Sequence, residues 1–359
     1  MSDLTDVSEL RRRLWEAVVD GDEYGAVDVV DAALAESVDE ETLLLEVIAP
    51  VQERIGSEWA ANRITVAQEH AATAINERVV AALAHRRPAA ERRTGRLGRV
   101  TVSCVDGEWH AFPARLVSEV LRLRGWRVDF LGAQTPTPHL IAHLHHTNPD
   151  AMLLSGSIPT HLPAAHTAIT ACQAIGVPVV TGGRAFGPDG RYARALGADR
   201  WAADAREAAA VLEAGLRRPA PSVTRQAVDD LPHLVDQEYT TVAQSRPRLV
   251  KQVLTDLDSR FPAMRAYSDA QRERTAEDIA HLVDFLVTAL YLDDPSIFTD
   301  FLTWTAGILE ARGVPAHSLV TGLRILADQL HDFPRSLGMI EAGTDAIEGD
   351  RPGPAPTHE

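Results

Sequence analysis

The segment Asp106-Gly107-Glu108-Trp109-His110 brings together residue types that can build a metal site. It lies between an expected strand, Arg99–Val105, and an expected helix. Because Glu108 and His110 are two residues apart, both side chains leave an extended loop on the same side. The carboxylate can then accept the N–H of one imidazole nitrogen, which fixes the tautomer and leaves the other nitrogen to bind a metal. The segment therefore predicts a metal centre with His110 as its ligand.

Four further residues are expected at the same place in the fold. Short apolar runs alternate with helical stretches around this segment, which predicts a parallel α/β sheet covered on both faces. Ser155 and Ser157 lie at the end of its third strand, expected at Ala151–Ser155, and the pair Gly182 and Gly183 follows the fourth. Each has an ordinary alternative, since serines cap strand ends and glycine pairs make tight turns. Together they predict a cleft for a large polar-edged cofactor at the carboxyl ends of the strands.

Helical segments flank the α/β segment on both sides. Thr65 and Gln68 have the spacing of a capping box that opens one helix of an N-terminal bundle. Polar, Pro-containing linkers are expected at Arg86–Gly95 and Arg217–Ser222. The predicted domains are a helical bundle at 1–88, an α/β domain at 98–217, a second helical domain at 228–338 and a disordered tail at 343–359.

Composition limits the class of protein. The chain has 359 residues and a formal net charge of −16, which argues against binding to nucleic acid because phosphate contacts need clustered Lys and Arg. The N-terminus lacks the features of a secretion signal, and no apolar run reaches the roughly 20 residues that span a bilayer. Cys104 and Cys172 form no spacing motif and are expected to be reduced thiols. We therefore expect a cytoplasmic protein with no membrane or nucleic-acid partner.

The order Glu108-x-His110, Ser155-x-Ser157, Gly182-Gly183 resembles the cobalamin-binding module of methionine synthase and its relatives. The resemblance implies a flavodoxin-like, doubly wound sheet with His110 as the lower axial ligand of cobalt and Glu108 as its hydrogen-bonding partner. It also implies that the two serines and two glycines line a channel for the cofactor's dimethylbenzimidazole tail. Pro113 stands where the family pattern has glycine, and Ser157 where it has leucine.

Trp59, nine intervening residues and then Glu69-His70 match the Trp-x9-Glu-His pattern of the CarH-type photoreceptors. The resemblance implies that the bundle caps adenosylcobalamin, with the tryptophan against the adenosyl group and the Glu-His pair beside it. An aromatic side chain suits the apolar face of a nucleoside, and a carboxylate can bond its hydroxyls. The alternative places Trp59 in the bundle core and the pair at an exposed helix start. Ala60 stands where CarH has a second histidine ligand.

The order of bundle, cobalamin domain and helical domain resembles that of the photocobilins. This resemblance implies a globin-like third domain that holds a bilin such as biliverdin. Asp278 and His281, which share a helix face at a spacing of three, are candidate partners of its pyrrole N–H groups. Asp278 could instead serve only the helix dipole. Since no cysteine follows Cys172, a bilin in this domain is held non-covalently.

We accordingly predict a light sensor and not an enzyme, with adenosylcobalamin as chromophore and biliverdin as a second one. Photolysis of the cobalt–carbon bond would change the packing of its domains, of a homo-oligomer such as a dimer, or of an unknown protein partner. A corrinoid methyl carrier of a methyltransferase system is the first alternative, and a light-independent cobalamin sensor is the second.

Overall fold

The computed structural model describes residues 6–87, 96–220, 231–260, 264 and 267–349. The chain divides into two units, residues 1–227 and residues 228–359. The parts of the expected linkers at residues 88–95 and 221–222 lie outside the described residues. Arg86, the first residue of the expected first linker, is the last residue of a helix.

The first unit begins with a helical bundle. Thr65 accepts a hydrogen bond from Gln68 N, and the Gln68 side chain accepts one from Thr65 N, which confirms the predicted capping box. The bundle core consists of apolar residues at helical spacing, including Leu14, Leu44 and Ile55, all of them buried. Its elements are α1 Val7–Val19, α2 Glu23–Ala35, α3 Glu40–Thr42, the π-helix η1 Leu43–Ile48, α4 Ala49–Ala60 and α5 Val66–Arg86.

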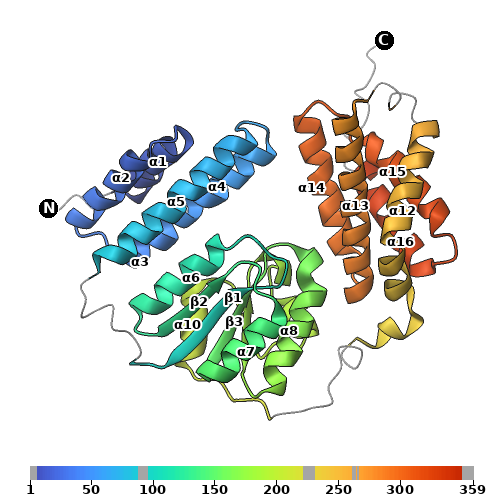
Figure 1. Ribbon diagram of the computed structural model, residues 1–359. Helices are drawn as coiled ribbons and strands as arrows, with labels where there is room; N and C mark the ends of the chain where they lie inside the picture. The colour runs from blue at the N-terminus through green and yellow to red at the C-terminus, as the bar shows by residue number, and fades with distance from the viewer. Residues whose placement is uncertain (1–5, 88–95, 221–230, 261–263, 265–266, 350–359) are drawn as a thin grey trace. The chain divides into compact units, whose positions relative to one another are not determined.

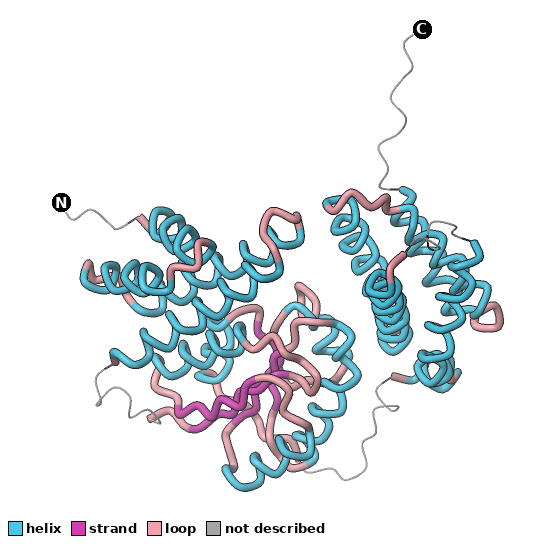
Figure 2. Tube along the Cα trace, turned by 45° about the horizontal axis from the view of Figure 1, so that its top comes forward, coloured by secondary structure: helices cyan, strands magenta, loops and turns pink. Residues whose placement is uncertain are grey.

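The α/β domain follows, and its five parallel strands have the order β2-β1-β3-β4-β5. This order confirms the predicted doubly wound sheet, and its topological switch point lies between β1 and β3. Figures 1 and 2 show helices on both faces of the sheet. The elements are β1 Arg99–Cys104, α6 Phe112–Leu123, β2 Arg127–Gly132, α7 Thr137–Thr147, β3 Ala151–Ser155, η2 Pro159–His161, α8 Leu162–Ala174, β4 Val179–Gly182, η3 Arg184–Phe186, α9 Arg191–Ala195, β5 Arg200–Ala202 and α10 Ala205–Glu213.

The bundle packs on the α/β domain through α6. Phe112, Leu116 and Val120 of that helix belong to the same buried cluster as the bundle core. Beside this apolar contact, the guanidinium of Arg87 pairs with Glu40 and, at 2.9 Å, with Glu119 of α6. Arg87 and Glu119 are both buried. Burying opposite charges together avoids leaving either one without a partner, so this cluster joins the two parts of the unit firmly.

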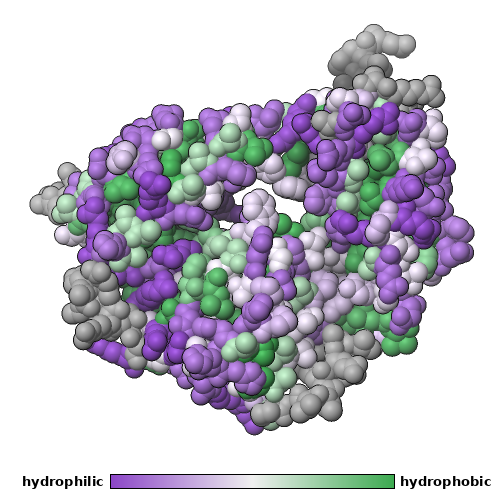
Figure 3. Space-filling view, viewed as in Figure 1, coloured by the Kyte–Doolittle hydropathy of each residue, from purple (hydrophilic) through white to green (hydrophobic). Residues whose placement is uncertain are grey.

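Polar and charged side chains cover most of the face drawn in Figure 3. No helix within the described residues is long and apolar enough to span a lipid bilayer.

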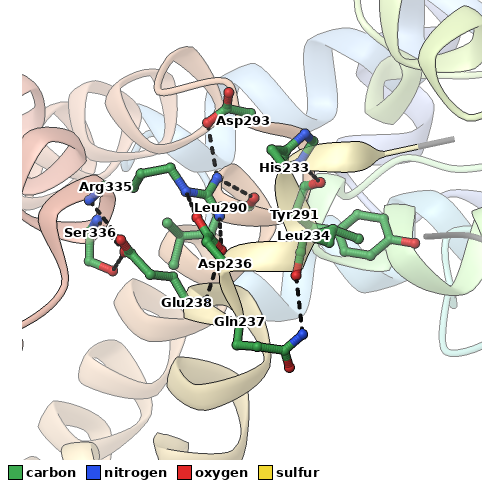
Figure 4. Close-up of polar contacts among 10 residues, drawn as sticks. All are labelled: His233, Leu234, Asp236, Gln237, Glu238, Leu290, Tyr291, Asp293, Arg335 and Ser336. Carbon is green, nitrogen blue, oxygen red and sulfur yellow. Dashed lines mark hydrogen bonds and ion pairs between the residues drawn. The ribbon is translucent and has the colours of Figure 1, made fainter. Parts of the chain in front are cut away.

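The second unit is helical. At its start, the carboxylate of Glu238 accepts hydrogen bonds from Arg335 N at 3.1 Å and from both Ser336 N and Ser336 Oγ at 3.0 Å (Figure 4). Glu238 thus caps the free N–H groups at the start of the last helix and complements its dipole. The unit comprises η4 Pro232–Asp236, α12 Glu238–Arg260, α13 Asp269–Leu292, α14 Ser296–Ala311, α15 His317–Gln329 and α16 Pro334–Gly349.

The prediction of a disordered tail from residue 343 is wrong for residues 343–349, which belong to α16. Gly343 is buried, and a Cβ atom added to it would lie 2.4 Å from Leu302 Cδ1 of α14. This glycine therefore allows two helices to approach closely instead of marking a break. Residues 350–359 lie outside the described part of the chain.

Candidate metal centre

The predicted metal site is a loop between β1 and α6 at the carboxyl edge of the sheet. The loop turns at Asp106 and Gly107. It is held against the next βα loop by two hydrogen bonds, from Gln134 N to the Glu108 carbonyl oxygen at 2.9 Å and from Thr137 N to Asp106 Oδ2 at 3.3 Å. Since the sheet order reverses beside β1, this loop lies where ligands bind in doubly wound folds.

Glu108 has no solvent exposure, and both of its carboxylate oxygens are occupied. Oε1 lies 2.6 Å from His110 Nδ1 and accepts the His110 backbone N–H at 2.9 Å. Oε2 accepts the backbone N–H groups of Ser157 at 2.8 Å and Ile158 at 3.0 Å. The carboxylate therefore joins the loop after β1 to the loop after β3.

These contacts keep Glu108 ionised. Burial alone would raise the pKa of its carboxyl, but hydrogen bonds from the side chain and backbone of His110 and from the backbone of Ser157 and Ile158 lower it to about 2. An ionised carboxylate is an acceptor only, so it fixes the proton of the imidazole on Nδ1. The other ring nitrogen, Nε2, then carries the lone pair that can bind a metal.

The His110 side chain is 42% exposed, and the exposed indole of Trp109 lies beside it with 4.7 Å between ring centroids. Within the described residues, no group of three or more His, Cys, Asp and Glu side chains could enclose a metal ion. In the part of the chain that the structure describes, His110 is therefore a candidate metal donor that stands alone, supported by a buried carboxylate. A metal whose remaining ligands come from a macrocycle suits such a donor.

A cavity of about 180 Å³ lies between the sheet and the helices α6 and α10. Three of the four residues predicted to line a channel, Ser155, Gly182 and Gly183, are in its wall. Ser155 and Gly182 are paired in register on β3 and β4. Ser157 is absent from this wall; its backbone N–H binds Glu108 instead. The cavity is smaller than the roughly 300–1,000 Å³ of whole-ligand pockets, so it suits one ring-sized arm of a larger cofactor.

Gly183 has a backbone that only glycine adopts easily, with φ +96°. A Cβ atom there would lie 2.3 Å from the Gly156 carbonyl oxygen. The chain therefore needs glycine to turn from β4 past the loop that carries Ser157. One imidazole donor, together with an apolar cavity that has a glycine in its wall at the same edge of the sheet, fits cobalamin, with His110 as the candidate cobalt ligand and the cavity as the candidate site of the tail.

The three residues predicted in the bundle lie at one end of the α4–α5 hairpin. Trp59 is the penultimate residue of α4, Glu69 is in the first turn of α5, and His70 follows it. Trp59 is half-buried against the bundle core, so it is neither a core residue nor fully exposed. Glu69 Oε2 contacts His70 Nδ1 at 2.5 Å.

Helix α4 of this hairpin also contacts the carboxyl edge of the sheet through a surface ion pair. Arg184, which follows Gly183, pairs with Glu53 of α4 at 2.9 Å. In Figure 1 the α4–α5 hairpin projects beyond the carboxyl ends of the strands. The fold thus places the bundle motif and the His110 loop on the same side of the α/β domain.

Asp278 and His281 both lie on α13 of the second unit and are exposed. Partial desolvation raises the pKa of the Asp278 carboxyl, and the charge of His281 opposes this rise. Their spacing of three residues places them on the same helix face, as predicted.

The sequence patterns missed several residues of the site. The backbone of Ile158, which binds Glu108, gives no signal because any residue type can supply an N–H. The helix side of the cavity includes Ala114 and Val117 of α6 and Ala205 and Ala208 of α10. In both helices these small residues recur at a spacing of three, and a helical projection of the sequence could have shown this stripe.

Comparisons with known proteins agree with the geometry. Residues 10–84 and residues 98–212 each match a family model described as a B12 binding domain. The trimethylamine corrinoid protein of Methanosarcina barkeri is 21% identical over 217 residues, which cover 59% of this chain and 99% of that protein. The structure of the monomethylamine corrinoid protein of Methanosarcina barkeri has a TM-score of 0.50 at 20% identity and covers 58% of this chain and 98% of that one, a likeness of fold. The chain is therefore a cobalamin-binding protein with two B12-binding domains.

Proposed function

We propose that the chain is a light sensor that holds adenosylcobalamin between its bundle and its α/β domain. Bound adenosylcobalamin supplies a cobalt–carbon bond that visible light breaks. The observation that carries the proposal is the position of Trp59, Glu69 and His70 at the same end of the α4–α5 hairpin, whose helix α4 also pairs with Arg184 after β4. A bulky indole and a carboxylate suit an adenosyl group better than a methyl group.

In this proposal each part of the site has one task. His110 would hold the cobalt through Nε2, and Glu108 orients the ring by its contact with Nδ1. The cavity lined by Ser155 and Gly183 would hold the dimethylbenzimidazole tail. Trp59 excludes water from the upper face. The proposal assigns binding and signalling to these residues, and no catalytic step.

The contacts of the bundle are consistent with release at one end. The α3 end is held by the buried pairs of Arg87 with Glu40 and Glu119. Near the α4–α5 hairpin, the ion pair of Arg184 and Glu53 is mostly exposed, and such pairs contribute at most about 1 kcal/mol. Loss of the adenosyl group would then loosen the α4–α5 hairpin more readily than the α3 end. This would change the surface that is open to a second copy or another partner.

The test is to load the full chain with adenosylcobalamin in the dark and to record its absorption spectrum and elution volume before and after green illumination. A change in both supports the proposal. An unchanged spectrum would refute it. A spectral change without any change in elution or partner binding would mean that photolysis occurs but produces no signal, which would contradict a sensor function. The variant Trp59→Ala is expected to retain less adenosylcobalamin, whereas Trp15→Ala removes a half-buried bundle tryptophan outside the Trp-x9-Glu-His pattern and serves as a control.

The proposal includes a bilin such as biliverdin, held non-covalently by a globin-like second unit. Asp278 and His281 are exposed on one face of α13, and the stacked rings of Phe285 and Phe301, with centroids 3.8 Å apart, join α13 to α14. Copurification of a red-absorbing pigment, and its loss in a variant with Asp278→Ala and His281→Ala, would support this part. Protein that takes up no biliverdin when mixed with it would refute it.

A corrinoid methyl carrier is the second candidate. It is favoured by the similarity to the trimethylamine corrinoid protein, which extends over 99% of that protein. In that case the partner would be a methyltransferase that docks at the carboxyl edge. Tighter retention of methylcobalamin than of adenosylcobalamin in the dark would favour this candidate over the light sensor.

A further inference from the structure

A chain of hydrogen-bonded polar side chains runs along the interface of α4 and α5. Asn76 Nδ2 donates to Gln52 Oε1 at 2.9 Å, and Gln52 Nε2 donates to Thr73 Oγ1 at 2.8 Å. The Thr73 hydroxyl in turn donates to Glu69 Oε1 at 3.2 Å. The other carboxylate oxygen of Glu69 contacts His70. We call Asn76, Gln52, Thr73 and Glu69 the polar seam.

The polar seam lies within an apolar bundle. Asn76 is fully buried, between Ile75 and Val79 of the bundle core, and its Oδ1 atom has no hydrogen-bond partner among the described residues. Burying an amide in an apolar core destabilises a fold unless it is hydrogen-bonded. The bundle accommodates this amide with one of its polar atoms unpaired, a cost that an apolar residue would avoid, so the seam calls for a role beyond packing.

Each donor in the seam points toward Glu69. Asn76 donates to Gln52, Gln52 to Thr73, and Thr73 to the carboxylate. On α5, Glu69, Thr73 and Asn76 are four and then three residues apart, so they share one helix face. On α4, Gln52 lies seven residues before Trp59, which places these two on one face as well. The seam therefore leads from the buried centre of the bundle to the end that carries Trp59 and Glu69.

We propose that Thr73 and Gln52 are positioning residues that hold the Glu69 carboxylate in place for the hydroxyl groups of the adenosyl ligand. This inference rests on the proposed function and adds to it the residues that set the choice of upper ligand. A glutamate in the first turn of a helix samples several rotamers, and fixing one of them before binding removes that entropy cost from the binding step. With Thr73 on one oxygen and His70 on the other, the carboxylate retains lone pairs in a defined direction.

The test measures the dissociation constants of the full chain for adenosylcobalamin and for methylcobalamin in the dark, together with the melting temperature. Thr73→Val keeps the shape of the side chain but removes the hydroxyl. We expect it to lower the preference for adenosylcobalamin over methylcobalamin about tenfold, equivalent to about 1.4 kcal/mol. Thr73→Ser, which restores the hydroxyl, should keep the preference. Ser57→Ala, on the exposed side of α4, is the control.

Glu69→Gln separates this inference from the proposed function. If Glu69→Gln lowers the preference and Thr73→Val changes only the melting temperature or weakens both cofactors equally, the seam is structural and the inference is wrong. If Glu69→Gln itself leaves the preference unchanged, the assignment of Glu69 to the adenosyl group fails, and the inference fails with it. If Thr73→Val does not fold, Gln52→Met takes its place. This variant keeps the Thr73 hydroxyl but removes the side chain that donates to it, so we expect a smaller loss of preference. No loss of preference would overturn the inference.

Discussion

Replacing Glu108 by glutamine tests whether one buried carboxylate organises the whole lower site. The wild-type carboxylate accepts four hydrogen bonds, two on Oε1 from His110 and two on Oε2 from Ser157 and Ile158. An amide has one oxygen and one NH₂ group, so it can satisfy only one of these pairs. If its oxygen faces Ser157 and Ile158, its NH₂ group faces the N–H groups of His110. In the other orientation, the NH₂ group faces the backbone N–H groups of Ser157 and Ile158, in a site with no water access.

The expected magnitude follows from the number of donors left without an acceptor. A buried donor that loses its partner costs about 1–3 kcal/mol, so two such donors in Glu108→Gln should lower the free energy of unfolding of the first unit by about 2–6 kcal/mol. Loss of the group that orients a metal-binding histidine typically weakens metal affinity about 10- to 100-fold. The retained cobalamin should also show a smaller fraction of histidine-ligated cobalt in its absorption spectrum.

The effect on stability should depend on pH in a defined direction. The pKa of Glu108 is lowered from its ordinary value of 4.5 to about 2 in the folded protein. Its ionised form therefore stabilises the fold fully above about pH 5, and this contribution is lost as the pH falls from 4.5 toward 2. The difference in unfolding free energy between wild type and Glu108→Gln should accordingly be largest near neutral pH and smaller near pH 3.

The assay is urea unfolding of the cofactor-free protein at several pH values, followed by titration with cobalamin. Glu207→Gln provides the control, since Glu207 is exposed and accepts one backbone hydrogen bond, from Ala203 N at 2.8 Å. It should change stability by less than about 0.5 kcal/mol. A Glu108→Gln protein with wild-type stability and wild-type cobalamin affinity would refute the view that this carboxylate holds the two loops and the imidazole together.

Three further substitutions have expected outcomes. Gly183→Ala places a Cβ 2.3 Å from the Gly156 carbonyl oxygen at a φ of +96°, so it should destabilise the first unit by more than about 2 kcal/mol and reduce cobalamin retention; wild-type melting behaviour would contradict this. Arg87→Met leaves the buried Glu119 without its inter-domain cation and should cost about 3 kcal/mol in urea unfolding, less if the other arginines around Glu119 compensate. Glu238→Gln weakens the cap of α16 and should lower the melting temperature of the second unit alone, with cobalamin affinity unchanged as the internal check.

Local patterns in the sequence were enough for most elements of the α/β domain. The third strand was predicted at Ala151–Ser155 and is found there, because a short run of apolar residues between turn signals is typical of a buried parallel strand. Gly125 and Gly176 follow α6 and α8 with positive φ, the conformation in which a glycine commonly ends a helix. Strand β5, with only three residues, was not identified from its own sequence, since so short a segment has no periodicity to read.

Local patterns misled where tertiary contacts decide the structure. The composition around Gly343 resembles that of a disordered tail, but the glycine is where α16 packs against α14. The pair Asp294-Pro295 is typical of an N-cap followed by the first helical residue, whereas the structure places the cap at Pro295, with Asp294 Oδ1 accepting a hydrogen bond from Ser296 N. In both cases the conformational preference of the residue type was correct. The predictions failed because the packing around each residue cannot be seen in the local sequence.

The sequence alone determined the chemistry that the site can perform. The pair Glu108 and His110, the serines and the glycines are residue types whose donors, acceptors and backbone freedom are fixed by their covalent structure. Only the tertiary structure decided how they are used: that Glu108 is buried and holds the loop after β3, that Ser157 acts through its backbone, and that a seam from Asn76 reaches Glu69. The reason is physical, since burial and hydrogen-bond partners depend on groups that lie far apart in the chain and become neighbours only when the sheet and the bundle have packed.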